Sequence, residues 1–179
     1  MSTPQVIAAP VFDFGAFTAA LDAQRRHRGL GWYECADELW NQSAELNAQL
    51  QDHPLCGGAV SRLAARGEAS CQYVLFMLRW LGRSPEDFLT HPAGVGPTPL
   101  PEPGAGSRLR FDLPELHAAA NATRQERGLT WAALGRELAC TPNRLTNLRT
   151  ARQADMELVM RLTQWLGRPA AEFVHAADW

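Results

Sequence analysis

Lysine is missing from this sequence of 179 residues, so all 17 of its basic residues are arginines. They are set against 19 acidic residues, which leaves a formal net charge of -2. A charge this close to zero provides no overall attraction to a negatively charged partner. Any surface that binds an anion must therefore come from a local cluster of arginines.

Long apolar runs are missing as well. No stretch approaches the ~20 consecutive apolar residues that a membrane-spanning helix needs. The beginning of the chain, "MSTPQVIAAPVF", has no basic region followed by an apolar core, which a secretory signal requires. We therefore expect no membrane association and a cytoplasmic location.

Motifs for metal binding and catalysis are also lacking. The spacings between Cys35, Cys56, Cys71 and Cys140 match no zinc pattern, and these residues are expected to be reduced thiols, mostly buried. The five histidines are scattered, and no Ser/His/Asp or Cys/His arrangement or Gly-Lys-Ser/Thr phosphate loop occurs. The sequence thus predicts no metal, no cofactor and no enzymatic activity.

An internal repeat organises the sequence. The segment "FDFGAFTAALDAQRRHRGLGW" (12–32) aligns with "FDLPELHAAANATRQERGLTW" (111–131). Further on, "RWLGRSPEDFL" (79–89) aligns with "QWLGRPAAEFV" (164–174). The offset falls from 99 residues in the first match to 85 in the second, so the first copy contains an insertion of 14 residues. The insertion lies between Leu39 and Leu63.

A segment rich in proline and glycine separates the two copies. Its sequence, "HPAGVGPTPLPEPGAGSR" (91–108), cannot form a helix or a central strand. We interpret it as an extended, semi-rigid linker. The predicted domains are therefore residues 1–90 and residues 109–179.

Capping residues and apolar spacing predict that both copies are helical. No alternating pattern predicts strands, so the expected fold class is all-α, with two tandem domains of about five helices each. A last helix is expected around residues 170–175. The expected N-caps are Asp13, Ser70, Asp112, Thr130, Thr141 and Asp155, and the expected helix stops are Gly82, Gly128 and Gly167.

Two short helices in the second copy are joined by a very short turn at Ala139 and Cys140, within "TWAALGRELACTPNRLTNLRT" (130–150). This arrangement is typical of a helix-turn-helix, whose second helix lies in the major groove of DNA. We expect Leu145 and Leu148 to face the core. The side chains that would then face outward, which suit contacts with bases and phosphates, are Asn143, Arg144, Thr146, Asn147, Arg149 and Thr150.

The same residues, followed by "RLTQWLGRPAAEFV", resemble the Xre/lambda-repressor-like helix-turn-helix family. Leu134-Gly135, Thr141-Pro142 and the two core leucines occupy places in its pattern, whereas Ala139 stands where a turn glycine is usual. Arg149 stands where an acidic residue is common. The resemblance implies compact, repressor-like domains in a transcription regulator that binds double-stranded DNA, commonly as a homodimer.

Site residues follow from this resemblance. It assigns DNA reading to Thr141, Asn143, Arg144, Thr146 and Asn147, and the start of the preceding helix, at Thr130 and Trp131, to phosphate contact. Arg149 and Arg152 complete "TPNRLTNLRTAR" (141–152), which contains no acidic residue. In the first copy, "CGGAVSRLAARGEAS" (56–70) matches the reading helix, but Gly57, Gly58 and Ala59 stand at the base-reading positions. Arg62 and Arg66 remain there as candidates for phosphate contact.

Two functions stay open on this basis. The first is a sequence-specific DNA-binding transcription regulator; an extended linker would reach ~56 Å at ~3.1 Å per residue, beyond the ~34 Å between half-sites. One chain or a homodimer could then span two half-sites. The alternative is a protein-binding adaptor or dimerisation protein that kept the fold without DNA affinity, which the acidic insertion favours. Trp40 and Trp179 lack counterparts in the repeat and are the better candidates for a partner surface.

Overall fold

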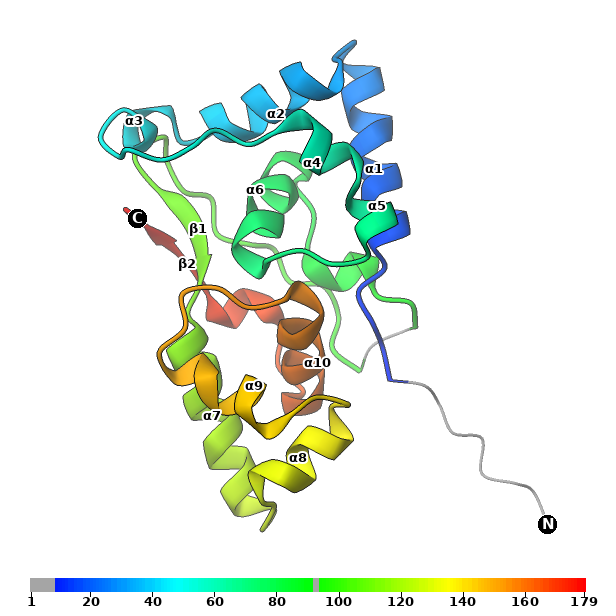
Figure 1. Cartoon of the computed structure of the whole chain (residues 1–179), viewed down its shortest axis with the longest axis vertical. Coiled ribbons are helices and arrows are strands. Elements are labelled where there is room, and N and C mark those ends of the chain that lie inside the picture. The colour runs from blue at the N-terminus through cyan, green and yellow to red at the C-terminus, as the bar shows by residue number, and fades with distance from the viewer. Residues whose placement is uncertain (1–8, 92–93) are drawn as a thin grey trace, which may run out of the picture.

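The computed structural model describes residues 9–91 and 94–179 (Figure 1). Over these residues the chain forms ten α-helices, three 3-10 helices and two short strands. The predominantly helical architecture predicted from the sequence is confirmed. Figure 1 shows two helical halves, the first above the second, which correspond to the two copies of the repeat.

The first half contains six α-helices and one 3-10 helix. Its first helix begins after Asp13, whose carboxylate accepts a hydrogen bond from the backbone N–H of Ala16 (2.9 Å), and its longest buried helix ends at the left-handed Gly82. The elements are α1 (Phe14–His27), α2 (Trp32–Asn41), α3 (Ala44–Asn47), α4 (Gly57–Ser61), α5 (Leu63–Arg66), α6 (Cys71–Leu81) and η1 (Pro85–Phe88).

The second half contains four α-helices, two 3-10 helices and the two strands. Asp112 and Thr130 cap its first two helices through their side chains, as predicted, and Gly167 ends the last one. The elements are β1 (Arg108–Phe111), α7 (Leu113–Glu126), α8 (Trp131–Glu137), α9 (Pro142–Thr146), η2 (Asn147–Arg149), α10 (Met156–Leu166), η3 (Ala170–Phe173) and β2 (Val174–Ala177).

The strands correct the sequence prediction, which had no strand and placed a last helix around residues 170–175. Helical structure there stops after the single turn of η3, and the chain continues extended from Val174. It pairs antiparallel with β1, so that Phe111 lies opposite Val174 and Arg108 opposite Ala177. Each strand has only four residues, and its partner lies far away in the sequence. The local sequence therefore gives little indication of either strand. The observed linker also ends one residue earlier than the predicted one, because Arg108 belongs to β1.

Equivalent contacts in the two halves support the internal repeat. The backbone N–H of Asp13 donates to the carbonyl of Phe88 (2.7 Å), and that of Asp112 donates to Phe173 (2.8 Å). Phe12 forms an isolated bridge with Leu89, at the position where Phe111 pairs with Val174. The short sheet of the second half thus has a single-bridge counterpart in the first half.

Tryptophans at equivalent positions of the two copies also make equivalent contacts. Trp80 Nε1 donates to the Glu38 carboxylate (2.9 Å), and Trp165 Nε1 donates to the equivalent Glu137 (2.8 Å). Arginines at equivalent positions lie over these rings: Arg28 is 4.9 Å from the centre of Trp80 and Arg127 is 4.4 Å from the centre of Trp165. These contacts fit the structural role that recurrence in the repeat indicates.

The two halves meet at equivalent positions of the repeat. Ser70 and Asp155, which precede α6 and α10, form an antiparallel bridge. The hydrogen bonds are reciprocal: Cys71 N–H donates to the Ala154 carbonyl (2.7 Å), and Met156 N–H donates to the Ala69 carbonyl (2.9 Å). A reciprocal contact between equivalent segments is the property of a two-fold axis. The repeat is therefore related to itself by an approximate two-fold axis through this bridge.

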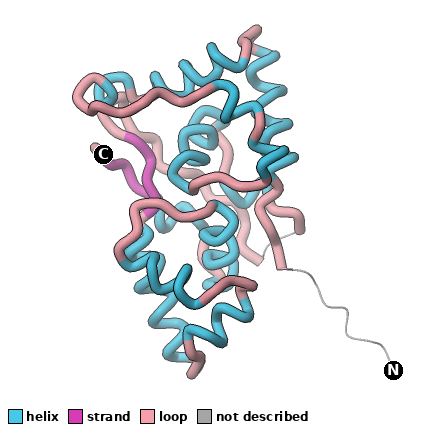
Figure 2. The backbone as a smooth tube through the Cα atoms, in the orientation of Figure 1, coloured by secondary structure: helices cyan, strands magenta, loops and turns pink. Residues whose placement is uncertain are grey.

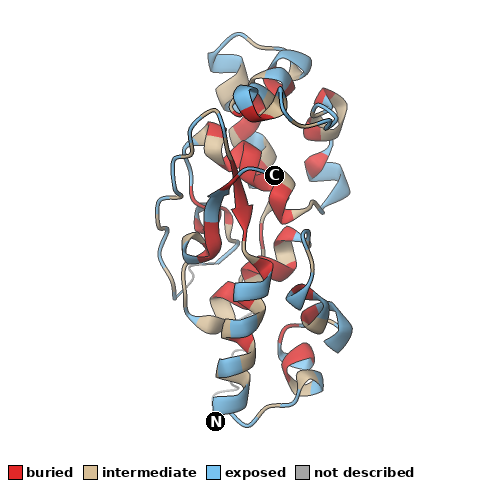
Figure 3. Cartoon of the chain, turned by 90° about the vertical axis from the view of Figure 1, so that its left-hand side faces the viewer, coloured by how far each residue is buried: buried red, intermediate tan, exposed pale blue. Residues whose placement is uncertain are grey.

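This axis sets which surfaces face the same way. In Figure 1, α4 of the first half and α9 of the second both lie on the side turned toward the viewer. In Figure 3, where burial is coloured, the short helices of both halves again lie along one side of the molecule. The corresponding helices α4 and α9 thus share one face.

Buried polar side chains join the halves beside the bridge. Gln72, on α6, donates to the carbonyls of Arg152 (2.8 Å) and Phe111 (3.2 Å) and accepts from the N–H of Phe111 (2.9 Å). Glu86 accepts from the backbone N–H of Ala170 (2.7 Å), and burial raises the pKa of its carboxyl group. Because an unmatched buried polar group is costly, these bonds favour one arrangement of the two halves.

The segment rich in proline and glycine lies along the first half, as the loop trace in Figure 2 shows. The Arg79 guanidinium donates to the carbonyls of Pro103 (2.8 Å) and Ser107 (3.3 Å), and the Ser84 hydroxyl donates to that of Thr98 (2.6 Å). Residues 94–107 contain no helix or strand, as predicted. The linker could extend to the length estimated from the sequence only if these hydrogen bonds broke.

Replacement of Gly57 by alanine tests the contact between α2 and α4. A methyl group there would lie 2.7 Å from the carbonyl oxygen of Trp32, and a backbone atom cannot move aside as a flexible side chain can. We expect Gly57→Ala to lower the free energy of unfolding by about 1–3 kcal/mol, measured by urea denaturation. The control is Gly58→Ala, whose methyl would have the end of the flexible Arg62 side chain as its nearest neighbour, at 3.0 Å. Equal losses in both variants would contradict this account.

Candidate nucleic-acid interface

The turn between α8 and α9 has the geometry that two closely joined helices require. Ala139 has a φ of 51°, in the left-handed region, and is the only non-glycine residue with positive φ in the described part of the chain. Glycine adopts this conformation without strain, whereas alanine rarely does. Gly135 lies so close to the carbonyl of Cys140 that an added methyl would be 2.7 Å away. These features let α9 begin next to α8.

Helix α9 presents its leucines to the core, as predicted. Leu145 and Leu148 keep only 1% and 2% of their surface exposed. The helix is shorter than expected, because α9 ends at Thr146 and the chain continues as the 3-10 turn η2. Burial of both leucines fixes which side chains of this segment face solvent.

Most of the predicted reading side chains are exposed. Asn143, Arg144, Asn147, Arg149 and Thr150 all face solvent. Thr146 differs, because it is half-buried and its hydroxyl donates to the carbonyl of Asn143 (3.3 Å). The exposed amides and guanidinium groups form a polar surface on α9, η2 and the residues just after them, which we call the α9 surface; its members are Asn143, Arg144, Asn147, Arg149 and Arg152.

Thr130, Trp131 and Thr141 lie at the starts of the two helices. The Thr130 hydroxyl accepts from the N–H of Ala133 (3.1 Å), while Thr141 is exposed and makes no side-chain capping bond. Trp131 is half-buried and stacks on His117, with 5.1 Å between ring centres. The structure thus gives Trp131 a packing role, and leaves Thr130 and Thr141 at the solvent-facing edge.

Arg144 has an acidic partner that the segment 141–152 does not contain. Its guanidinium forms an ion pair with Asp155, and both side chains remain nearly half exposed. The prediction that the Asp155 carboxylate caps α10 is wrong in this respect, because that side chain makes no capping bond and turns to Arg144 instead. An ion pair this exposed contributes only about 0–1 kcal/mol, so a phosphate or a base can compete for Arg144 at small cost.

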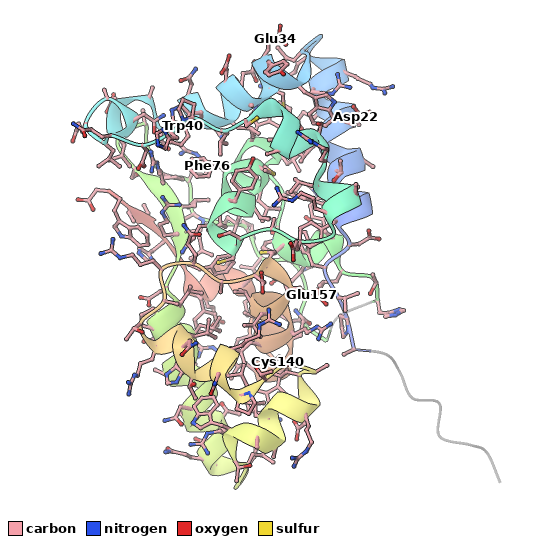
Figure 4. The ribbon with its side chains drawn as sticks, in the orientation of Figure 1. Asp22, Glu34, Trp40, Phe76, Cys140 and Glu157 are labelled. Atoms are coloured by element: carbon pink, nitrogen blue, oxygen red, sulfur yellow. The ribbon has the colours of Figure 1, made fainter. Side chains whose placement is uncertain are left out.

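The Arg144–Asp155 pair borders a cavity of about 550 Å³ between the two halves. Arg66 from α5, Cys140 from the turn and Glu157 from α10 also line it. Figure 4 shows Glu157 near the junction of the halves, with Cys140 below it in the second half. The structure therefore brings together Arg66 and Arg144, which the sequence analysis assigned to separate copies.

Arg149 and Arg152 have no carboxylate partner among residues 9–91 and 94–179. Arg149 is exposed and contributes to lowering the pKa of His117. The Arg152 guanidinium lies over the exposed ring of Trp179, 5.4 Å from its centre, and its carbonyl accepts from Gln72. Positive charge is therefore available at the C-terminal end of the α9 surface.

The first half does not form an equivalent reading surface. Gly57 is buried against the backbone of Trp32, so the first helical position of α4 serves packing. The Arg62 side chain folds back on α4, where its Nε donates to the carbonyl of Gly58 (2.8 Å). Arg66 is exposed on α5. Of the two arginines predicted to contact phosphate, Arg66 is thus the one that faces solvent without such a bond to its own helix.

Neither a metal-binding cluster nor a membrane-spanning helix is found among the described residues. No group of three or more His, Cys, Asp or Glu side chains there could hold a metal ion, and no helix there is long and apolar enough to cross a membrane. Cys35 and Cys71 are buried, and burial raises the pKa of each thiol to about 11. Cys140 is half-buried and Cys56 is exposed.

Comparisons with known proteins give this geometry no family assignment. No protein-family model matches the chain, and no curated protein or solved structure matches it either. The functional argument therefore depends on the residues of this chain.

The stability of the fold should respond to the titration of His117. Burial, followed by the charges of Arg149 and Arg124, lowers its pKa from the usual 6.5, so the folded state favours the neutral imidazole. The unfolded chain binds the proton more readily, so this contribution is complete above pH 6.5 and is lost as the pH falls below it. We expect urea denaturation between about pH 7.5 and about pH 5.5 to show a smaller loss of stability in His117→Asn than in wild type. Equal losses would contradict the assignment.

Proposed function

We propose that the protein is a DNA-binding transcription regulator with two tandem helix-turn-helix domains, in which the second reads the bases of a double-stranded site. The observation that carries the proposal is the α9 surface. The leucines of the same segment are buried, while Asn143 and Asn147 offer exposed amides and Arg149 offers an exposed guanidinium. Amide and guanidinium groups on a short helix after a tight turn suit the edges of adenine and guanine in the major groove.

The approximate two-fold axis supports binding to two adjacent half-sites. Dimeric regulators place two reading helices on one face because their operators have two-fold symmetry. In this chain α4 and α9 share a face without a second molecule (Figure 1). Because α4 lacks reading side chains, we propose an asymmetric site, with base contacts from the second half and phosphate contacts from Arg62 and Arg66 of the first.

A homodimer that pairs two second domains is the other arrangement compatible with the repeat. It would read both half-sites with identical α9 surfaces, and so would select a palindromic sequence. The single-chain arrangement selects a sequence with only one specified half. The symmetry of the enriched site, together with the mass of the complex in solution, distinguishes the two arrangements.

A protein-binding adaptor is the second candidate function. It is favoured by the excess of acidic residues in the first copy, where residues 1–90 contain 7 arginines and 10 acidic residues. The exposed ring of Trp179 also suits a protein partner better than a phosphate. An adaptor predicts no sequence enrichment in a genomic pull-down.

The first test of DNA reading is Arg144→Ala, examined by a mobility shift on the site that a genomic pull-down enriches. Loss of a guanidinium that contacts a base should weaken specific binding by about 1–3 kcal/mol, or roughly 5- to 150-fold. The matched control is Arg26→Ala, which removes the same charge from an exposed position on α1. Unchanged affinity in Arg144→Ala would remove Arg144 from the reading surface.

Asp155→Asn is expected to act in the opposite direction. It frees Arg144 from its ion pair and removes a negative charge beside the α9 surface. We expect DNA affinity to rise about 2- to 5-fold at low salt, while the free energy of unfolding changes by less than about 1 kcal/mol. Asp22→Asn, which removes a carboxylate paired with two arginines on α1, is the control and should leave DNA affinity unchanged. Weaker binding by Asp155→Asn would contradict the proposed competition.

A further inference from the structure

A groove of about 380 Å³ lies in the second half, where the first described residues of the chain meet α8 and α10. It is lined by residues 9–11, by residues 137–139 and by Arg161, Gln164 and Trp165 of α10. We call it the α10 groove. Alanine, proline, valine, leucine and tryptophan side chains make up most of its lining, so it suits an apolar occupant.

The charged side chains of the α10 groove already have partners. Glu137 accepts a hydrogen bond from Trp165 Nε1 (2.8 Å), and Arg161 forms an ion pair with Glu157. Two nitrogen donors are left over, because Arg161 Nε and Gln164 Nε2 are buried and have no hydrogen-bond partner among the described residues. An unmatched buried donor is costly. The groove therefore fits an uncharged segment that offers backbone carbonyl groups.

In the first half, the chain itself occupies the equivalent position. The repeat places Gln164 at the position of Arg79, 85 residues earlier. The Arg79 guanidinium donates to the carbonyls of Pro103 (2.8 Å) and Ser107 (3.3 Å). Residues 103–107, which lead directly into β1, are thus bound to α6 by the side chain that corresponds to Gln164.

The residues that follow this segment show the same relation in both copies. Arg108, which precedes the first helix of the second copy, lies 4.7 Å from the centre of the Trp40 ring in the first half. Val11, which precedes the first helix of the first copy, lines the α10 groove with Leu138 and Trp165 of the second half. Each copy thus extends the residues before its first helix onto the other copy, as the approximate two-fold axis requires.

The repeat continues upstream of these residues. The segment "PQVIAAPVF" (4–12) aligns with "PGAGSRLRF" (103–111) at the offset of 99 residues that relates the first helices. Pro4 corresponds to Pro103 in this alignment. Residues 4–8 are therefore the counterpart of the segment that Arg79 binds in the first half.

The differences between the two segments match the surfaces that they face. Val6 stands at the position of the half-buried Ala105, and Ile7 at that of the exposed Gly106. In the first half the insertion covers this position, because the N–H of Leu46 donates to the carbonyl of Ala105 (3.2 Å). The second half lacks the insertion, and the larger apolar side chain of Val6 suits a groove that the insertion leaves uncovered.

We propose that residues 4–8 of this chain occupy the α10 groove, as residues 103–107 occupy the equivalent position on α6. In this arrangement Gln164 Nε2 donates to a carbonyl of the segment, and the Val6 side chain packs against the ring of Trp165. The residues that precede the first half are then bound to the second half.

The position of residue 9 favours a segment of this chain over any other occupant. Ala9 lines the groove, so residues 4–8 enter it from its edge. Five residues reach up to ~17 Å, whereas Arg161 and Trp165 are only ~6 Å apart along α10. Residues 1–8 contain no charged side chain, and their covalent connection gives them a high effective concentration at the groove.

Nuclear magnetic resonance of the full chain without DNA tests the proposal, which does not depend on DNA binding. We expect backbone order parameters of residues 5–8 near ~0.85, as in a rigid segment, and a nuclear Overhauser contact between the Val6 methyl groups and the Trp165 ring. Order parameters below ~0.6 without this contact would overturn the proposal.

Two charge substitutions in the segment test the register that the repeat predicts. Val6→Asp places a charge in an apolar groove and should lower the order parameters of residues 5–8 below ~0.6. Ile7→Asp adds the same charge at the position of the exposed Gly106 and should leave the segment ordered. Equal loss of order in both variants, or loss in Ile7→Asp alone, would overturn this register.

Two substitutions in the groove test the hydrogen bond. Gln164→Ala removes the donor and should lower the order parameters of the segment, whereas Gln164→Arg supplies the residue of the first copy and should keep them at the wild-type level. Unchanged order in Gln164→Ala would overturn the role of Gln164.

A dilution series identifies the chain that supplies the segment. Binding within one chain predicts that the order parameters and the Val6–Trp165 contact stay the same on tenfold dilution, in a protein with the mass of a monomer. Loss of the contact on dilution, together with a dimer at the higher concentration, would assign the groove to the segment of a second copy and overturn the proposal.

Discussion

The reciprocal backbone pairing of Ser70 with Asp155 is the contact on which the arrangement of the molecule depends. It joins the two copies of the repeat at equivalent residues, and so generates the two-fold relation that turns α4 and α9 to one face (Figure 1). Gln72 and Glu86 add buried hydrogen bonds on either side of it. The same junction positions the ion pair between Arg144 and Asp155. Asp155 forms the backbone bridge with Ser70, and its side chain forms the ion pair with Arg144.

Around this junction the two copies have diverged in what they offer to a partner. The second copy keeps exposed amides and guanidinium groups on a short helix, whereas the first begins the corresponding helix with a buried glycine. The first copy in turn contains the insertion, part of which lines a cavity together with the buried Arg108 and Arg110 of β1. In the functional account, one copy reads a duplex and the other contacts only its phosphates.

Local signals in the sequence predicted much of the fold. The caps at Asp13, Asp112 and Thr130 and the stops at Gly82 and Gly167 act within a few residues, so they can be recognised without knowledge of the rest of the chain. Features that depend on distant residues were missed. The β1–β2 pair joins Phe111 to Val174, the linker is held by Arg79, and the partner of Arg144 lies just beyond the acid-free stretch 141–152.

The central claim is that the α9 surface reads one half of an asymmetric DNA site while the first half of the molecule contacts only phosphates. Hydroxyl-radical footprinting combined with methylation interference, on the sequence enriched from genomic DNA, tests it most directly. The account predicts backbone protection over two adjacent half-sites with base-specific interference in only one of them. Interference in both half-sites would contradict the asymmetric assignment, and absence of any enriched or protected sequence would contradict DNA reading altogether.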